Sequence, residues 1–153
     1  MAQRGGAVQA ALRLSDEPIA GELVPRGTAD LILSVEPLEV LRYTDYLGPE
    51  GWIVSGADPM ANIPDYPPLE DVHQRITSFP RSILVPAASL AREAGNAHAA
   101  NTVLLGAALH LVPVSPQTLA AVLVDGFGEK GDKVVQANLR ALEAGRALGS
   151  PAG

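Results

Sequence analysis

Residues 30–56 read DLILSVEPLEVLRYTDYLGPEGWIVSG, and this stretch decides the fold. Its opening run, 30–35, lacks the polar alternation of a half-exposed strand, so we expect a strand inside a sheet with both faces covered. Pro37 suits the first turn of a helix, and apolar residues at helical spacing extend that helix to the GPEG turn. A second strand is expected over 52–55. Two strands joined by one such helix are parallel with a right-handed crossover, which indicates the α/β class.

The composition excludes several classes of function. The chain has 153 residues, which fits one domain, and its net charge of -6 argues against a nucleic-acid or anionic-membrane partner. It has no cysteine, so disulfides, thiolate catalysis and cysteine-ligated iron–sulfur or zinc sites in this chain are excluded. No signal peptide or bilayer-spanning apolar run is present. We therefore expect a soluble cytoplasmic protein.

The segments on either side of this stretch extend the same pattern. Apolar and polar residues alternate over 7–14, which predicts an edge or half-exposed strand, and 19–24 is a second short extended candidate. The four prolines of 58–68 predict a surface loop. A helix over 69–78 and an apolar strand over 82–85 follow. The order strand, helix, strand, helix, strand predicts a parallel three-strand core.

The C-terminal third is expected to be helical. Ser115 and Pro116 supply a cap and a first-turn proline for a helix that reaches about residue 126. The other helical segments are expected over 87–94, 97–112 and 132–148. The sequence thus predicts a three-layer Rossmann-like α/β domain with a mostly parallel central sheet, followed by a disordered tail at 150–153.

Four short motifs, in order along the chain, carry a resemblance to a known family. They are Arg4-Gly5-Gly6, Glu36-Pro37, Asn101 with Leu105-Gly106, and Lys133 with Asn138, Ala141 and Gly145. With these motifs the chain resembles, over residues 1–149, the gamma-type domain of thiamine-diphosphate-dependent 2-oxoacid:ferredoxin oxidoreductases, and most closely the beta subunit of those that act on indolepyruvate. Members of that family open with a strand and a GxGGQG turn before the RGG motif. The resemblance therefore implies an N-terminally truncated domain, or strands supplied from elsewhere.

The resemblance also implies a function. The chain would be a subunit, or a fragment of one, in an enzyme that oxidatively decarboxylates indolepyruvate or another 2-oxoacid to an acyl-coenzyme A and passes the electrons to ferredoxin. Thiamine diphosphate and iron–sulfur clusters would lie in an alpha-type companion subunit, with coenzyme A as co-substrate and ferredoxin as an indirect partner. This chain would bind no cofactor alone, supply no catalytic residue and contribute architecture, with part of the coenzyme A site as a further role.

The candidate binding residues each have a plain structural explanation as well. Arg4, Gly5 and Gly6 could present a guanidinium and free amides to a phosphate, but such a triplet also makes an ordinary turn before a strand. Glu36 follows the central strand at its carboxyl end, where open α/β sheets place ligands, although acids at strand ends also cap helices. The resemblance makes a coenzyme A contact or a subunit contact the functional hypothesis for Arg4, Gly5 and Gly6, whereas cofactor binding by Glu36 is predicted from its place at the end of the strand.

No other residue pattern indicates an active site. His73, His98 and His110 are too scattered for a metal centre, so no metal site is predicted. Asn101 and Asn138 are expected to be buried helix residues that bond to a neighbouring loop. Catalytic-triad, P-loop and dinucleotide motifs are absent from the sequence. The alternative function is a free-standing Rossmann-like or flavodoxin-like binding domain without redox activity. A neighbouring gene for a thiamine-diphosphate subunit would favour the first hypothesis.

Overall fold

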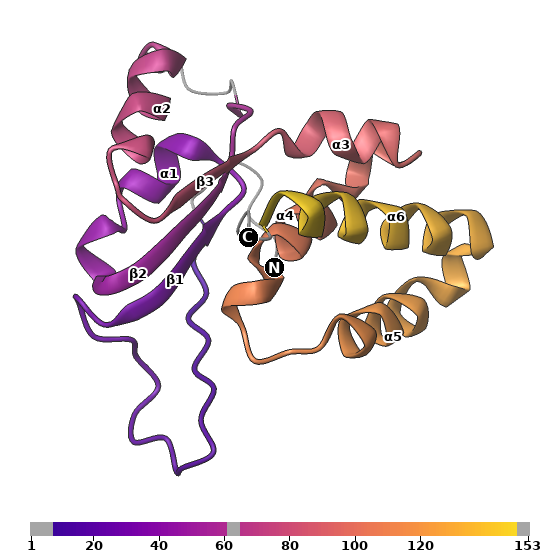
Figure 1. The fold of residues 1–153 in the computed structure, drawn as a ribbon, viewed down its shortest axis with the longest axis horizontal. Coiled ribbons are helices and arrows are strands. Elements are labelled where there is room, and N and C mark those ends of the chain that lie inside the picture. The colour runs from indigo at the N-terminus through magenta and orange to yellow at the C-terminus, as the bar shows by residue number, and fades with distance from the viewer. Residues whose placement is uncertain (1–7, 61–64, 150–153) are drawn as a thin grey trace.

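The computed structural model describes residues 8–60 and 65–149. Within them, three parallel strands form one sheet in the order β1 (Ala29–Ser34), β2 (Leu47–Gly56) and β3 (Ser82–Val85). Leu33 lies opposite Val54 in the first pair of strands, and Val54 lies opposite Ile83 in the second. The predicted parallel α/β sheet is confirmed, and β3 has the bounds expected from the sequence (Figure 1).

Helices cover both faces of this sheet, which makes three layers. Along β2 successive side chains point to opposite faces. Ile53 packs with Val40 of α1 (Pro37–Leu41) and Ile76 of α2 (Leu69–Thr77). Val54 packs in the second core, against helices from the C-terminal third. Both side chains are fully buried, so β2 is the centre of the domain.

The C-terminal third is helical, as predicted. Its α-helices are α3 (Ala87–Glu93), α4 (Ala100–Ala108), α5 (Pro116–Phe127) and α6 (Asp132–Gly149). Short 3-10 turns lie at Thr44–Tyr46, Ala97–Ala99, Leu109–Leu111 and Gly128–Lys130. Ser115 caps α5 by accepting the N–H of Thr118 at 3.0 Å, which confirms the predicted start of that helix. Within the described ranges, no helix has the length and apolar character needed to cross a bilayer.

Helices α4 and α6 cross at backbone contact. A Cβ built on Gly145 would lie 1.9 Å from the Val103 carbonyl oxygen, and one on Gly106 would lie 2.1 Å from the Leu142 carbonyl oxygen. Real Cβ atoms essentially never come that close to another atom, so only glycine fits at either position. Ala141 is fully buried beside them. The family motifs in these two helices therefore mark the crossing that holds the helical layer together.

Strand β1 departs from its prediction. It was expected inside the sheet, but it pairs only with β2 and forms an edge of the described sheet. Its side chains are half-buried or exposed, and Leu33 is 39% exposed. An apolar run indicates low contact with water but does not specify which neighbours exclude it, so the edge position could not be predicted from periodicity alone.

The helix after β1 is shorter than predicted, and the GPEG segment is not a turn. Helix α1 ends at Leu41, whose carbonyl accepts the Thr44 hydroxyl at 3.2 Å, because a threonine side chain competes for helical carbonyls. Residues 48–51 belong to β2, where the register with β1 shifts between Ala29 and Leu31. Such an irregularity lets a strand carry glycine and proline without breaking the sheet.

The segment before β1 also differs from the prediction. Residues 8–14 and 19–24 were expected as extended strand pieces, and neither forms a strand. Residues 8–22 are exposed throughout, because these residues have no neighbouring strand with which to pair. Of the predicted loop 58–68, the described residues are irregular, whereas residues 61–64 and the predicted tail at 150–153 lie outside the described residues.

Candidate functional site

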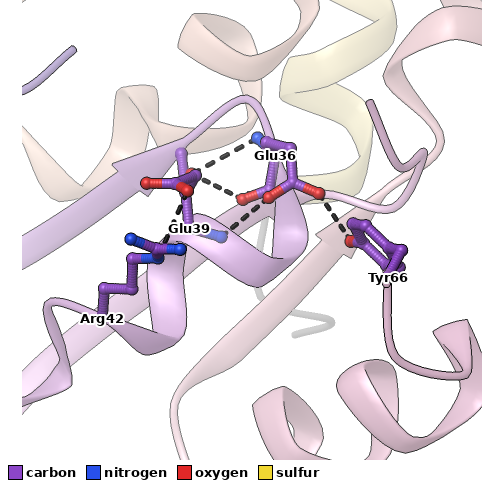
Figure 2. Close-up of polar contacts among 5 residues, drawn as sticks. Glu36, Glu39, Arg42 and Tyr66 are labelled. Atoms are coloured by element: carbon purple, nitrogen blue, oxygen red, sulfur yellow. Dashed lines mark hydrogen bonds and ion pairs between the residues drawn. The ribbon is translucent and has the colours of Figure 1, made fainter. Parts of the chain in front are cut away.

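Glu36 lies just past the carboxyl end of β1 and begins α1. Its side chain is 7% exposed, and its Oε2 accepts the backbone N–H of Glu39 at 2.7 Å. Pro37 occupies the first turn, where its missing N–H costs nothing. Figure 2 shows the carboxylate of Glu36 turned toward this helix and toward the neighbouring loop. The helix-capping role considered for Glu36 is therefore confirmed, while its role in coenzyme binding stays a prediction.

The other oxygen of the same carboxyl group holds Tyr66. The Tyr66 hydroxyl donates to Glu36 Oε1 at 2.5 Å, across thirty positions of sequence (Figure 2). Burial, and then the hydrogen bond to Glu36, raise the pKa of Tyr66 well above its ordinary value. The phenol is thus a proton donor at neutral pH. It ties the proline-rich loop to the end of β1.

Three further side chains, those of Ser34, Glu39 and Arg42, complete the polar cluster. The Ser34 hydroxyl donates to the Glu36 carbonyl at 2.7 Å, which fixes the bend between strand and helix. Arg42 Nε lies 3.3 Å from Glu39 Oε1, whereas Glu39 Oε2 is buried and has no hydrogen-bond partner among the described residues. The cluster is rich in acceptor oxygens. It suits a ligand group that donates hydrogen bonds, such as a hydroxyl or amine, and it repels a phosphate.

The segment that follows β2 is anchored to the same edge of the sheet. Asp58 Oδ2 accepts the N–H of Ala88 at 3.1 Å and so caps the short helix α3, and the Ala57 N–H donates to the Val85 carbonyl at 2.8 Å. A Cβ on Gly56 would lie within 2.3 Å of the Val35 carbonyl oxygen, so β2 can pass this point only with glycine. The carboxyl ends of all three strands are therefore held in one rigid arrangement.

The remaining residues singled out in the sequence have structural contacts. His73 Nε2 lies 2.8 Å from the Ala57 carbonyl oxygen, and the His110 ring packs edge-on against Trp52 with centroids 5.7 Å apart. His98 lies in a separate 3-10 turn, where its N–H donates to Asn96. In the part of the chain that the structure describes, no group of three or more potential ligands could hold a metal ion.

The two asparagines behave differently from each other. Asn138 is 1% exposed, accepts the Thr102 hydroxyl at 2.8 Å and donates to the Val134 carbonyl at 2.9 Å. Its burial is as predicted, but its partner is helix α4 and not a loop. Asn101 is exposed, so the expectation of a buried side chain is wrong there. It lies on the outer face of α4, while the next position, Thr102, faces α6.

A separate hollow of about 350 Å³ lies between the end of α3 and the start of α6. It is lined by Gly95, Asp132, Lys133, Gln136 and Arg140. Arg140 already donates to the Ala94 carbonyl from Nε at 3.0 Å and from Nη2 at 2.8 Å, so this side chain serves to join the two helices. None of the residues that line the hollow belongs to the Glu36 cluster, and its charged residues are exposed.

A family model described as pyruvate ferredoxin/flavodoxin oxidoreductase matches residues 1–148. The chain belongs to this family. The predicted resemblance to 2-oxoacid:ferredoxin oxidoreductases is thereby confirmed. The matched range includes the Glu36 cluster and the α4–α6 crossing, together with Arg4, Gly5 and Gly6, which lie outside the described residues.

Curated members of the family point to one branch of it. The indolepyruvate oxidoreductase subunit IorB of Pyrococcus horikoshii is 35% identical over 95% of this chain and 75% of its own length. The protein of the same name from Thermococcus kodakarensis is 33% identical over the same shares. The prediction that the chain is most similar to subunits of indolepyruvate enzymes is in line with both relatives.

A solved structure supports the fold assignment. The 2-oxoglutarate:ferredoxin oxidoreductase from Magnetococcus marinus, with 2-oxoglutarate, coenzyme A and succinyl-CoA bound, is similar with a TM-score of 0.63 and 27% identity. The similarity covers 88% of this chain but only 22% of that chain. The similarity therefore concerns one part of that larger polypeptide.

Sequence reasoning missed two residues of the site, Tyr66 and Asp58. Both lie in the proline-rich segment that was predicted only as a surface loop. The order of the elements could have indicated both residues, because a segment that leaves the carboxyl end of one parallel strand emerges at the same edge of the sheet as Glu36. A tyrosine in such a segment can reach a buried carboxylate, but its pairing with Glu36 depends on the path of the loop.

Proposed function

We propose that the chain acts as the smaller subunit of an indolepyruvate:ferredoxin oxidoreductase, together with a companion subunit that holds thiamine diphosphate and iron–sulfur clusters. The observation that supports this most directly is the similarity to IorB subunits, at 29–35% identity over 95% of the chain. The reaction is the oxidative decarboxylation of an aryl 2-oxoacid with coenzyme A, which yields an acyl-coenzyme A, carbon dioxide and reduced ferredoxin.

The composition of the chain indicates which subunit holds the redox cofactors. A cluster in a ferredoxin-reducing enzyme is normally held by cysteine thiolates, and these 153 residues include none. Thiamine diphosphate supplies the carbanion chemistry at the 2-oxoacid when it is bound. The electron path therefore runs through the companion subunit, and this chain contributes the rigid α/β body against which the companion subunit is placed.

We further propose that the carboxyl edge of β1 faces the coenzyme A path. In open α/β sheets ligands bind outside this edge, and the Glu36–Tyr66 cluster is rigid and rich in acceptors there. Glu36 suits hydroxyl or amine groups of the coenzyme, whereas Arg4 with Gly5 and Gly6 has the chemistry for its phosphates. The neighbouring solved enzyme was determined with coenzyme A bound, which is compatible with this assignment.

The test is reconstitution with the thiamine-diphosphate subunit from the same organism, by co-expression and co-purification. Ferredoxin reduction is measured with indolepyruvate, pyruvate and 2-oxoglutarate, each with coenzyme A, for the complex and for each subunit alone. We expect activity that needs both subunits and prefers indolepyruvate. If the companion subunit reduces ferredoxin equally well without this chain, the subunit function is refuted.

The coenzyme assignment needs its own measurement in the active complex. Arg4→Ala should raise the KM for coenzyme A while the KM for the 2-oxoacid stays constant, because only the phosphate contact is lost. Arg92→Ala, at an exposed arginine of helix α3, is the matched control. Equal effects of Arg4→Ala on both KM values would argue for a general loss of assembly instead.

A further inference from the structure

Residues 8–28 form an arm that projects from the body of the protein before β1 begins. Figure 1 shows its two limbs running away from the sheet and joining at a tip that touches none of the helices. All its residues are exposed except Val24, which is half-buried. An arm of this length in water normally indicates either a solvated polar loop or a surface that is covered in an assembly.

The arm is apolar on one side. Val8, Ala10, Leu12 and Leu14 alternate along its outgoing limb and share one face of the extended backbone. Leu12 is 76% exposed, and Leu23 on the returning limb is 81% exposed. A solvated loop has no physical reason to place aliphatic side chains at every second position, because each of them costs free energy in water. The pattern is that of a strand whose neighbour is missing.

The shape of the arm is fixed by specific contacts. Arg13 Nη1 donates to the carbonyls of Ala20 at 3.2 Å and Gly21 at 2.7 Å, which braces one limb against the other. At the root, the Gly27 N–H donates to the Asp45 carbonyl at 2.9 Å. The arm is therefore preorganised, with its apolar side chains facing outward, and such preorganisation lowers the entropy cost of binding.

The backbone of the arm is available as well. Among the described residues, no backbone-to-backbone hydrogen bond joins residues 8–24 to any other segment. Free N–H and C=O groups beside alternating apolar side chains are the two requirements for adding a strand to an open sheet edge. The arm fulfils both without any rearrangement of the domain.

We propose that this arm is the element by which the chain holds its companion subunit, with the apolar face of residues 8–14 entering an aliphatic groove beside an open strand edge of that subunit. The inference rests on the proposed function, which requires such a subunit. The arm leads into the amino end of β1, whereas the Glu36 cluster lies past the carboxyl end. A subunit held at the arm thus leaves the candidate coenzyme site open.

The chemistry of the arm favours a permanent partner. Permanent interfaces are more apolar than transient ones, which rely on charge to speed association. The arm carries scattered charges of both signs and an aliphatic face, and it offers no concentrated patch to steer a soluble electron carrier. A second copy of this chain is the other conceivable occupant, and the experiment separates the two.

The test compares arm variants with a matched control in the co-expressed complex. The arm variant is Leu12→Asp with Leu23→Asp, and the control is Val122→Asp with Val124→Asp on α5, where both valines are also exposed. Affinity for the thiamine-diphosphate subunit is measured by titration, and the oligomeric state of the isolated chain by light scattering. Thermal unfolding shows whether each variant is folded.

We expect the arm variant to bind the companion subunit at least about tenfold more weakly than wild type, with an unchanged midpoint of unfolding, and the control to bind normally. Equal binding by the arm variant and wild type would overturn the proposal while leaving the subunit function intact. A wild-type chain that does not bind the companion at all refutes the subunit function, and the arm proposal with it. A wild-type dimer that the arm variant makes monomeric would assign the arm to a second copy and overturn the proposal.

Discussion

The helix crossing at Gly145 permits a quantitative prediction. In Gly145→Ala the new Cβ would lie 1.9 Å from the Val103 carbonyl oxygen and 3.0 Å from the Ala107 nitrogen, against ordinary contacts of at least 3.4 Å. Both obstacles are backbone atoms of α4, so no side chain can rotate away. The two helices must separate, which loosens the packing of fully buried neighbours such as Ala141.

Two terms of opposite sign decide the size of the effect. Overpacking of a filled interior costs about 1–3 kcal/mol, and a backbone clash belongs at the upper end of that range. Alanine is better than glycine in a helix interior by about 1 kcal/mol. We therefore expect the free energy of unfolding to fall by about 2 kcal/mol, which lowers Tm by about 4–8 °C in a domain of this size.

The control is Gly126→Ala in helix α5. A Cβ there meets nothing within 4 Å, so only the propensity term applies and the variant should be more stable by about 0.4–1 kcal/mol. Urea unfolding, followed by far-UV circular dichroism and by the fluorescence of Trp52, gives both values. A Gly145→Ala protein as stable as wild type would refute the reasoning that the α4–α6 contact is at its closest limit.

Three further predictions concern the polar contacts. Burial and the hydrogen bond to Glu36 raise the pKa of Tyr66 above 10.0, so the folded state holds the phenol proton more tightly than the unfolded state does. The stability that this provides is fully present below about pH 10 and is lost as the pH rises above it. Above pH 10 the urea midpoint should therefore fall more steeply for wild type than for Tyr66→Phe. Asn138→Ala leaves the buried Thr102 hydroxyl without its acceptor and should cost about 1–3 kcal/mol in the same urea assay, whereas adding Thr102→Val, which removes the unpaired hydroxyl, should restore part of that stability. Asp58→Ala removes the cap of α3 and should cost about 0.5–2 kcal/mol, whereas Asp58→Asn should retain most of that stability; equal losses in thermal unfolding would contradict a capping role.

The site illustrates how far local sequence reasoning reaches. Glu36 was found because its position depends on one local rule, the place of a polar residue at the end of a parallel strand. Its capping bond to Glu39 is also local, three residues away. Tyr66 was missed because its contact spans a strand and a proline-rich loop, and no periodic pattern encodes the path of such a loop.

For the arm, by contrast, a local pattern predicted a strand that does not form. The alternation of residues 8–14 predicts a strand, and the alternation is present, but a strand also needs a neighbour to accept its hydrogen bonds. Within the described residues no segment pairs with it, so the same pattern remains an exposed, extended limb. The predicted strand is therefore wrong within the described residues, and the unpaired pattern became the basis for inferring a partner.

By itself, the sequence determined the α/β class, the parallel order of the core strands, the approximate places of most helices and the family to which the chain belongs. These properties depend on the spacing of apolar residues, on proline and glycine at element ends, and on motif order, all of which are local along the chain. Only the tertiary structure decided that β1 lies at a sheet edge, that Tyr66 binds Glu36, and that α4 and α6 cross at backbone contact over Gly106 and Gly145. Each of these depends on which distant segments come together, and that choice is made by the summed packing of the whole domain, which no local pattern contains.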